Sequence, residues 1–467
     1  MLIRYKCFSH FIIFYIRIFY KGKFMLLSLF NKYFLSAATP ILLMISGIII
    51  TLKLRGFYIF HPVRSAKLLL RREERGETSP FSALCLALAG TLGVGNIVGV
   101  ASAIMTGGYG AVFWMWVSAA LAMSLKYAEI VISMKYRRVT DKGYRGGAAY
   151  YICAAFRSLN LNRTGRILAQ IFVIFCVLNS LTMGCMLQSN AISSSLSHVL
   201  EIKPAIIGLA VAALLVASLL YKSGKVEKIT NIIVPIMSLL YIVFCLIAIL
   251  LRRDRIDDAF ALIFKDAFNL ESAGGGALGF LTSRAFRAGS MRGLVSNEAG
   301  AGTAPTAHAL SDTKIPEKQG LMGVFEVFAD TIILCTLTAI VIIISGADLG
   351  VDNPMILIMN SFSADLGKPS DYFLCVSIFL FAFATLICWA KYGLSALEYL
   401  IDRPCVKGIY IFVFAVLVIL GTVFTSNAIW DASDFSIGIM TIINLIAIFI
   451  LRKEITRPEL KRKSYKL

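Results

Sequence analysis

The sequence is short of charged residues and lacks the cysteine and histidine patterns of soluble metalloenzymes. Only 16% of its 467 residues are Asp, Glu, Lys or Arg, whereas about a quarter are charged in soluble domains. The ten cysteines form no CxxC pair and the four histidines form no HExxH motif, so neither a zinc site nor a disulfide framework is predicted. The sequence contains no P-loop, which argues against coupling to ATP.

What the chain has instead is an excess of apolar residues, 58% of the total, and a net charge of +19. A soluble chain of this length cannot hide so much apolar surface, so we expect an integral membrane protein with the lipid bilayer as its partner. In a membrane protein the positive charge indicates Lys and Arg held on the cytoplasmic side, and nucleic acid is not an expected partner.

Eleven apolar stretches predict transmembrane helices, each of which needs about 20 mostly apolar residues. They lie at about 35–54, 81–105, 109–134, 167–196, 204–221, 229–251, 274–309, 319–346, 370–400, 408–425 and 435–451. The predicted fold class is therefore an all-α integral membrane protein.

The loops between these spans carry their basic residues unequally. Of the 46 Lys and Arg, 28 lie in one alternating set of loops and 6 in the other. This imbalance predicts an inner-membrane protein with a cytoplasmic C-terminus and a basic cytoplasmic tail at 452–467. Residues 1–34 carry six further basic residues on the opposite side. We predict either an extra interfacial helix there or a translation start at Met25.

Two of the predicted spans are interrupted by glycine and polar residues. The first interruption is AGTLGVGNIVG at 89–99, and the second is GSMRGLVSNEAGAGTAP at 289–305. Taken singly, each is compatible with close helix packing through small residues. With span 35–54 set aside as an extra N-terminal helix, the others divide into five-helix repeats at 81–251 and 274–451, each with its break in its first helix. Matching broken helices are typical of secondary transporters built from inverted repeats.

Such breaks suit the binding of a carboxylate and a cation. Half-helix N-termini offer N–H groups to a carboxylate, and freed carbonyl groups can hold Na⁺. Gly93 and Gly95 are predicted at the unwound point. Asn96 and Thr91 lie beside it, although Asn96 can also act as a helix cap and Thr91 can bond its own i−4 carbonyl.

The segments GTLGVGNIVGVASAI, FWMWVSAALAMSLKYAE, RGLVSNEAGAGTAPTAHA and DTIILCTLTAIVI resemble the hallmark segments of the alanine/glycine:cation symporter family, the sodium:alanine symporters. The resemblance implies a LeuT-like fold of two five-helix repeats with one extra N-terminal helix. It also implies uptake of alanine or glycine with Na⁺, or sometimes H⁺, as the coupling ion, and no other cofactor.

The resemblance completes the set of candidate site residues. Gln188, Ser296, Asn297 and Trp389 resemble substrate contacts of the family, and Thr385 resembles a sodium ligand. The alternatives are interhelical hydrogen bonding for Gln188 and an aromatic-belt position for Trp389. The predicted substrate-binding residues are Gly93, Val94, Gly95, Asn96, Gln188, Val295, Ser296, Asn297 and Trp389, and the predicted Na⁺ ligands are Thr91, Leu92 and Thr385.

Several charged residues fall within the predicted spans. Lys126 and Glu129, at i and i+3, are expected to pair on one helix face. Glu326 and Asp330, one turn apart, are predicted either to lock a buried network or to carry a coupling proton. Glu298 is predicted to bond exposed backbone N–H groups at the second break.

The sequence departs from the family at the predicted pocket. Val94 stands where many members have Thr, Val295 where they have Phe, and Ala384 where they have Ser. These changes predict weaker Na⁺ dependence or a different substrate. The favoured hypothesis is a symporter for a small neutral amino acid, and the alternative is a diverged sensor that no longer transports. An enzyme is not expected, and the sequence makes no prediction about oligomeric state.

Overall fold

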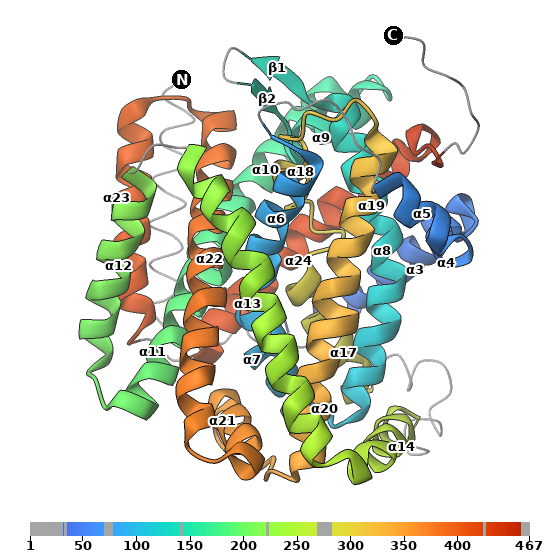
Figure 1. The fold of residues 1–467 in the computed structure, drawn as a ribbon. Coiled ribbons are helices and arrows are strands. Elements are labelled where there is room, and N and C mark those ends of the chain that lie inside the picture. The colour runs from blue at the N-terminus through green and yellow to red at the C-terminus, as the bar shows by residue number, and fades with distance from the viewer. Residues whose placement is uncertain are drawn as a thin grey trace.

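A computed structural model describes residues 31, 35–69, 78–140, 143–220, 224–268, 283–423 and 426–458, which form a bundle of helices with one small β-hairpin (Figure 1). Within these described residues, seven helical stretches are long and apolar enough to cross a membrane, and shorter apolar helices accompany them. The predicted all-α membrane fold is confirmed. The predictions for residues 1–34 fall, apart from residue 31, outside the described residues, as does the first part of the span predicted at 274–309.

Each of the eleven predicted spans coincides with a helix or with successive helices among the described residues. These are α3 (Ser36–Leu54), α6 and α7 (Pro80–Thr91, Val98–Gly107), α8 (Gly110–Tyr136), α10 and α11 (Asn162–Leu181, Gln188–Leu200), α12 (Pro204–Leu220), α13 (Gly224–Leu251), α17 and α18 (Arg284–Asn297, Pro305–His308), α19 and α20 (Pro316–Val327, Thr336–Ser345), α22 (Pro369–Leu400), α23 (Pro404–Gly421) and α24 (Ser426–Ile450).

Short elements connect these helices. Two π-helices interrupt long spans, η3 (Thr182–Leu187) between α10 and α11, and η5 (Phe328–Cys335) between α19 and α20. The other short helices are α4 (Phe57–Phe60), α5 (Pro62–Leu69), α9 (Ala148–Arg157), α14 (Ile256–Ala267), α21 (Pro354–Leu366) and the 3₁₀ turns η2 (Val94–Asn96), η4 (Arg253–Arg255) and η6 (Arg452–Glu454). The antiparallel strands β1 (Arg138–Thr140) and β2 (Gly143–Arg145) pair Arg138 with Arg145.

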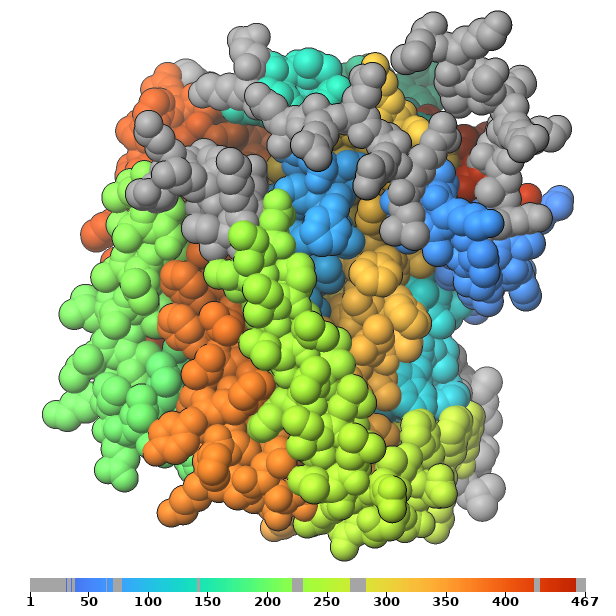
Figure 2. All heavy atoms as spheres, in the orientation of Figure 1, coloured from blue at the N-terminus to red at the C-terminus, as the bar shows by residue number. Residues whose placement is uncertain are grey.

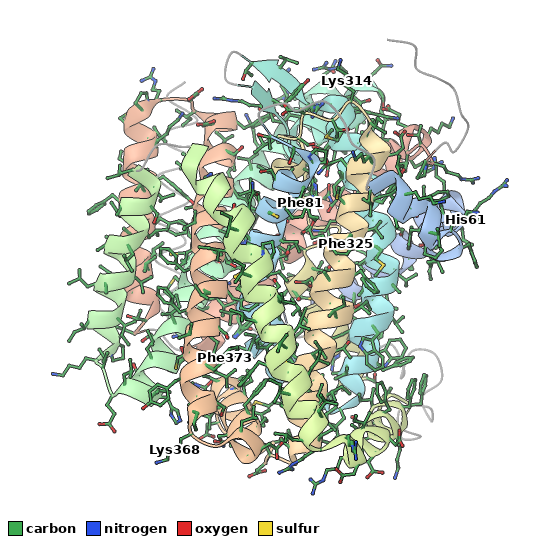
Figure 3. All side chains as sticks on the ribbon, in the orientation of Figure 1. His61, Phe81, Lys314, Phe325, Lys368 and Phe373 are labelled. Atoms are coloured by element: carbon green, nitrogen blue, oxygen red, sulfur yellow. The ribbon has the colours of Figure 1, made fainter. Side chains whose placement is uncertain are left out.

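The two ends of the bundle carry different elements. The β-hairpin and Lys314 lie at one end, here called the hairpin end, and α14, α21 and Lys368 lie at the opposite end (Figures 1 and 3). The predicted alternation of loops places the segments around Lys314 and Lys368 on opposite sides of the membrane, and the structure agrees with this alternation.

The outer helices show apolar side chains to their surroundings, and the central helices bury theirs. Leu209 of α12, Leu239 of α13 and Phe412 of α23 are 62–70% exposed, and α12 and α13 form much of the visible flank in Figure 2. By contrast, most of α8 is buried against α17 and α19. Apolar side chains facing outward suit a lipid environment, while the polar groups described below are enclosed by the central helices.

Candidate functional site

The first break separates α6 from α7. Leu92 and Gly93 leave the helical conformation, and η2 follows before α7 begins at Val98. Gly93 permits a close approach of two side chains, because a Cβ atom there would lie 2.8 Å from Thr385 Oγ1 and 3.0 Å from Gln188 Oε1. The predicted break at Gly93 is therefore confirmed, and α11 and α22 supply its polar neighbours, Gln188 and Thr385.

The second break separates α17 from α18. α17 ends at Asn297, and Glu298, Gly300 and Gly302 all adopt positive φ, at 53°, 83° and 79°. Glycine tolerates this conformation, whereas for Glu298 it is strained. Pro305 at the first position of α18 then restarts the helix. The chain thus turns sharply twice at the place where the sequence predicted an interruption.

The two breaks meet each other at a buried carboxylate. A Cβ atom on Gly95 would lie 3.3 Å from Ser296 Cα, so the two backbones are in close contact. Asn96 Nδ2 donates to Asp330 Oδ1 at 2.7 Å and to Ser296 Oγ at 3.2 Å. The hydroxyls of Ser296 and Thr331 each donate to Asp330 Oδ2 at 2.7 Å. We call Asn96, Ser296, Asp330 and Thr331 the Asp330 cluster.

The Asp330 cluster is enclosed and incompletely satisfied. Its four side chains are at most 1% exposed. Asn96 Oδ1 is buried without a hydrogen-bond partner among the described residues, and the negative charge of Asp330 is met by neutral donors only. Asn297 joins the edge of the cluster, because its amide donates to Thr331 Oγ1 at 3.1 Å. Buried oxygen atoms around an unpaired carboxylate form an environment suited to a hard cation.

For Glu326 and Asp330 the sequence predicts either a buried network or a coupling proton. Glu326 lies in a buried network, because it accepts from Lys126 Nζ at 3.1 Å and lies 2.9 Å from His308 Nε2, with all three side chains fully buried. Asp330 lies in π-helix η5, which begins at Phe328, and contacts residues of the two breaks. Asp330 therefore belongs to the breaks, and Glu326 belongs to a separate ion-pair network.

Two further predictions about buried carboxylates are corrected by the structure. Lys126 forms its ion pair with Glu326 of α19 and not with Glu129 on its own helix. Glu129 Oε2 instead accepts from the Gly302 backbone N–H at 3.2 Å and from Asn444 Nδ2 at 3.0 Å. Glu298, expected to bond backbone N–H groups, accepts from the Thr303 hydroxyl at 2.5 Å. One backbone N–H of the second break, that of Gly302, is thus satisfied by Glu129 from a different helix.

Gln188 lies at the first break, as predicted, and its amide is already engaged there. The Val94 backbone N–H donates to Gln188 Oε1 at 3.2 Å, and Gln188 Nε2 donates to the Met183 carbonyl of η3 at 3.1 Å. Gln188 therefore ties π-helix η3 to the unwound backbone. A carboxylate that approaches the Val94 N–H has to compete with this amide oxygen.

Of the three predicted sodium ligands, Thr385 and Leu92 meet at the first break and Thr91 does not reach it. Thr385 Oγ1 lies within hydrogen-bond distance of the Ala89 carbonyl at 2.9 Å, the Leu92 carbonyl at 3.4 Å and its own i−4 carbonyl, that of Phe381, at 3.0 Å, which places α22 directly against the end of α6. Thr91 Oγ1 bonds only the carbonyl of Ala87, at 3.4 Å, the i−4 bond that its own helix provides, among the contacts of the described residues. Thr385 and the Leu92 carbonyl together form the second group of oxygen atoms at the site.

Trp389 is fully buried, which excludes the aromatic-belt alternative. A Cβ atom at Gly184 would lie 2.3 Å from Trp389 Cβ, so the indole packs tightly on η3. It also meets the Tyr392 ring edge to face at 5.5 Å. Val295, at 1% exposed, precedes Ser296 on α17. Trp389 and Val295 are thus both buried, and Trp389 Nε1 has no hydrogen-bond partner among the described residues.

Contacts close the bundle on both sides of the breaks. Toward the opposite end, Arg292 Nη1 bonds Asp434 Oδ1 at 3.2 Å and its guanidinium lies 4.1 Å from the Trp430 ring centroid. Toward the hairpin end, Thr78 N–H donates to Asp312 Oδ2 at 2.5 Å and the Asp312 N–H donates to the Thr78 carbonyl at 2.9 Å. The Asp330 cluster, whose side chains are at most 1% exposed, has no contact with solvent in this conformation.

The sequence is similar to that of known transporters over most of its length. Residues 23–465 match the sodium:alanine symporter family. A Haemophilus influenzae protein named as an uncharacterized transporter is 37% identical, covering 92% of this chain and 94% of its own length. The sodium/alanine symporter AgcS of Methanococcus maripaludis is 36% identical, covering 88% and 91%.

Two further similar proteins are a relative named for a different substrate and a solved structure of low sequence identity. A Bacillus subtilis protein named as a probable sodium/glutamine symporter, GlnT, is 34% identical and covers 88% of this chain and 85% of its own. Among solved structures, a manganese transporter from Eremococcus coleocola aligns with a TM-score of 0.47 at 14% identity, covering 81% of this chain and 79% of that chain.

Proposed function

This chain belongs to the sodium:alanine symporter family, and we propose that it moves a small neutral amino acid into the cell together with Na⁺ by alternating access. It is a multi-pass membrane transporter and not an enzyme. Within the proposal, the two repeats are 81–251 and 274–451, the C-terminus is cytoplasmic, and the membrane is the cell membrane. Family membership does not fix which amino acid is moved, because the named relatives include both an alanine and a glutamine symporter.

One observation carries the proposal: the Asp330 carboxylate is fully buried where the two helix breaks meet, with no cationic side chain among its hydrogen-bond partners in the described structure. A buried carboxylate is stable only when it is paired, protonated or bound to a cation. The side-chain oxygens of Asn96, Ser296, Asp330 and Thr331 supply the hard oxygen ligands that Na⁺ prefers.

The substrate amino acid is proposed to bind at the same two helix breaks as the cation. α7 begins at Val98 without a side-chain cap, so its N-terminal dipole is free to attract a carboxylate. Gly93 and Gly95 bring the backbone close to Thr385, Gln188 and Ser296. Val295, where the family has Phe, widens the space for the substrate side chain, and one extra methylene changes selectivity by only about 1–3 kcal/mol. Alanine and slightly larger neutral amino acids are therefore the proposed substrates.

Uptake into proteoliposomes tests this function. We expect an inward Na⁺ gradient to drive accumulation of labelled alanine, with glycine and glutamine as competitors to define the size limit. A chain that binds alanine but accumulates no amino acid under either a Na⁺ or an H⁺ gradient is a sensor, and that result would overturn the proposal. Accumulation driven by H⁺ alone would retain symport and replace the coupling ion.

Asp330→Asn tests the cation site within this function. The substitution keeps the size and removes the charge, and each hydrogen bond to a charged group contributes about 1.5–3 kcal/mol. We expect at least about a tenfold rise in the Na⁺ concentration for half-maximal uptake, since 1.4 kcal/mol is about a factor of ten. Asp371→Asn, near the start of α22 and away from the breaks, serves as the matched control. Equal Na⁺ dependence in both variants would exclude Asp330 as a cation ligand.

A further inference from the structure

The chain changes direction at the end of α3 and forms a short appendage on one flank of the bundle. Arg55 and Gly56 adopt positive φ, at 53° and 56°, so the chain leaves the axis of α3 directly after Leu54. α4 and α5 follow on this flank, toward the hairpin end, with His61 between them at its outer edge (Figures 1 and 3). We call residues 55–69 the flank segment.

One face of the flank segment packs on the bundle and another is apolar and exposed. The Tyr58 hydroxyl donates to the Ala120 carbonyl of α8 at 3.4 Å, and Ser65 is 8% exposed. By contrast, large apolar side chains are 53–73% exposed at Ile59, Phe60 and Val63. Figure 2 shows the blue segment standing out from the flank. A short helical element with an exposed apolar face is typical of the membrane–water interface.

An exposed apolar stripe leads along α3 to the flank segment. Its side chains are 41–71% exposed and belong to Ile45, Ile48, Ile49 and Leu52. They follow the i, i+3, i+4, i+7 spacing that places residues on one face of a helix. The residue after the stripe is Lys53, near the end of α3. An apolar path that ends at a cation is complementary to an acyl chain that ends at an anionic headgroup.

Four cationic side chains from distant parts of the chain meet at this end of α3. They are Lys53 of α3, Lys135 of α8, Arg452 of η6 and Arg457, and we call them the cationic cluster. Lys53 Nζ donates to the Arg452 carbonyl, and Arg457 Nη2 donates to the Lys53 carbonyl at 2.6 Å. The other three cations are close enough to repel the charge of Lys53. Because gathered like charges repel one another, the cluster favours the binding of an anion.

The acids beside the cationic cluster do not pair with it. Glu454 accepts from the Tyr136 hydroxyl at 2.7 Å, and Glu317 accepts from the Thr456 hydroxyl. Among the described residues, no carboxylate forms an ion pair with the cluster.

The cluster also keeps hydrogen-bond donors for a ligand. Its side chains each use one or two N–H groups on backbone carbonyls, whereas a lysine carries three and an arginine five. Capping the carbonyl groups at helix ends explains the bonds that are made. It does not use the remaining donors, which are available to the oxygen atoms of a phosphate.

We propose that the cationic cluster is a binding site for an acidic phospholipid. The phosphate group lies among the four cationic side chains, one acyl chain lies along the stripe on α3, and the flank segment lies among the neighbouring lipids. Basic groups at the end of a membrane helix attract anionic headgroups, and the adjoining apolar stripe favours a lipid over a soluble anion. The bound lipid joins α3 to α8 and to the segment after α24.

The test measures, by native mass spectrometry, which lipids stay bound to the purified protein. The protein is incubated with equimolar phosphatidylglycerol and phosphatidylcholine that carry identical acyl chains. Each basic side chain near an anionic lipid contributes about fivefold in binding, so Lys53→Gln/Arg457→Gln should reduce the preference for phosphatidylglycerol by at least about tenfold. Lys461→Gln/Lys463→Gln removes the same charge from the tail at 459–467 and should keep the wild-type preference. An equal loss in both variants would overturn the proposal, because surface charge in general would then explain it.

Two measurements on the wild type decide the proposal even if a variant does not fold. Raising ammonium acetate from about 0.1 M to about 1 M shortens the screening length from about 10 Å to about 3 Å, so the preference for phosphatidylglycerol should fall. A wild type with no such preference would overturn the proposal. Excess inorganic phosphate should leave phosphatidylglycerol bound, and its displacement would show that the cluster binds a soluble anion instead.

Discussion

Replacing Lys126 with methionine tests whether its buried ion pair with Glu326 stabilises the folded bundle. Lys126 Nζ lies 3.1 Å from Glu326 Oε1, and both side chains are fully buried. Methionine retains most of the aliphatic length and removes the charge, which leaves Glu326 with His308 alone, at 2.9 Å. Breaking one side of a buried pair costs about 3–5 kcal/mol, because the remaining charge stays buried and unpaired.

The expected size of the effect follows from the length of the chain. An unfolding entropy of about 2.1 cal/mol/K per residue gives about 1 kcal/mol/K for a chain of this length, so the loss corresponds to about 3–5 °C in apparent Tm. Removing both charges in Lys126→Met/Glu326→Met should recover most of this loss, since buried pairs replaced by apolar residues are often neutral in stability. The assay is the temperature at which the monodisperse peak in size-exclusion chromatography falls by half. A single variant as stable as the wild type, or a double variant no more stable than the single one, would refute the account of a buried pair.

Two further substitutions probe the site and its closure. Gly93→Ala places a Cβ atom 2.8 Å from the Thr385 hydroxyl, and we expect at least about a tenfold loss of alanine uptake, or about 1.4 kcal/mol. Gly408→Ala, where an added Cβ meets no described heavy atom within 4 Å, should leave uptake unchanged. Arg292→Ala removes a half-buried ion pair worth about 1 kcal/mol. Because this pair is expected to hold the bundle closed, its loss should let a small membrane-impermeant thiol reagent label Cys335 about fivefold faster, as measured by mass spectrometry. Unchanged labelling would show that this pair does not close the site.

The helices and their breaks were predictable from the sequence because each depends on a local pattern. Long apolar stretches define spans whatever their partners, and glycines near Gly93 and Gly300 weaken a helix wherever they occur. The positions of Thr385 and Gln188 beside the first break also agree with the prediction, although it was the family resemblance and not the residue pattern that indicated them.

The partners of the buried charges were not predictable in the same way. Spacing along one helix suggested that Lys126 pairs with Glu129, but Lys126 pairs with Glu326 and Glu129 bonds Gly302 and Asn444. Asn96 and Asp330 are 234 positions apart, and no single-sequence pattern reports such a contact. A π-helix is equally invisible in composition, and Asp330 lies in π-helix η5. The one available signal was an acid in an apolar span, which marks a functional residue by default.

The position of Asp330 also explains why an ion can govern the movement of the whole bundle. Asn96 belongs to the first broken helix, Ser296 to the second, and Asp330 to η5, so the cluster joins elements from both halves of the chain. Closing the bundle around Asp330 without a cation buries an unpaired charge, which is strongly unfavourable. Under the proposed function, Na⁺ binding removes that penalty and the same hydrogen bonds then draw the two breaks together. Coupling of the ion to the amino acid therefore needs no direct contact between them, because both act on the same closure.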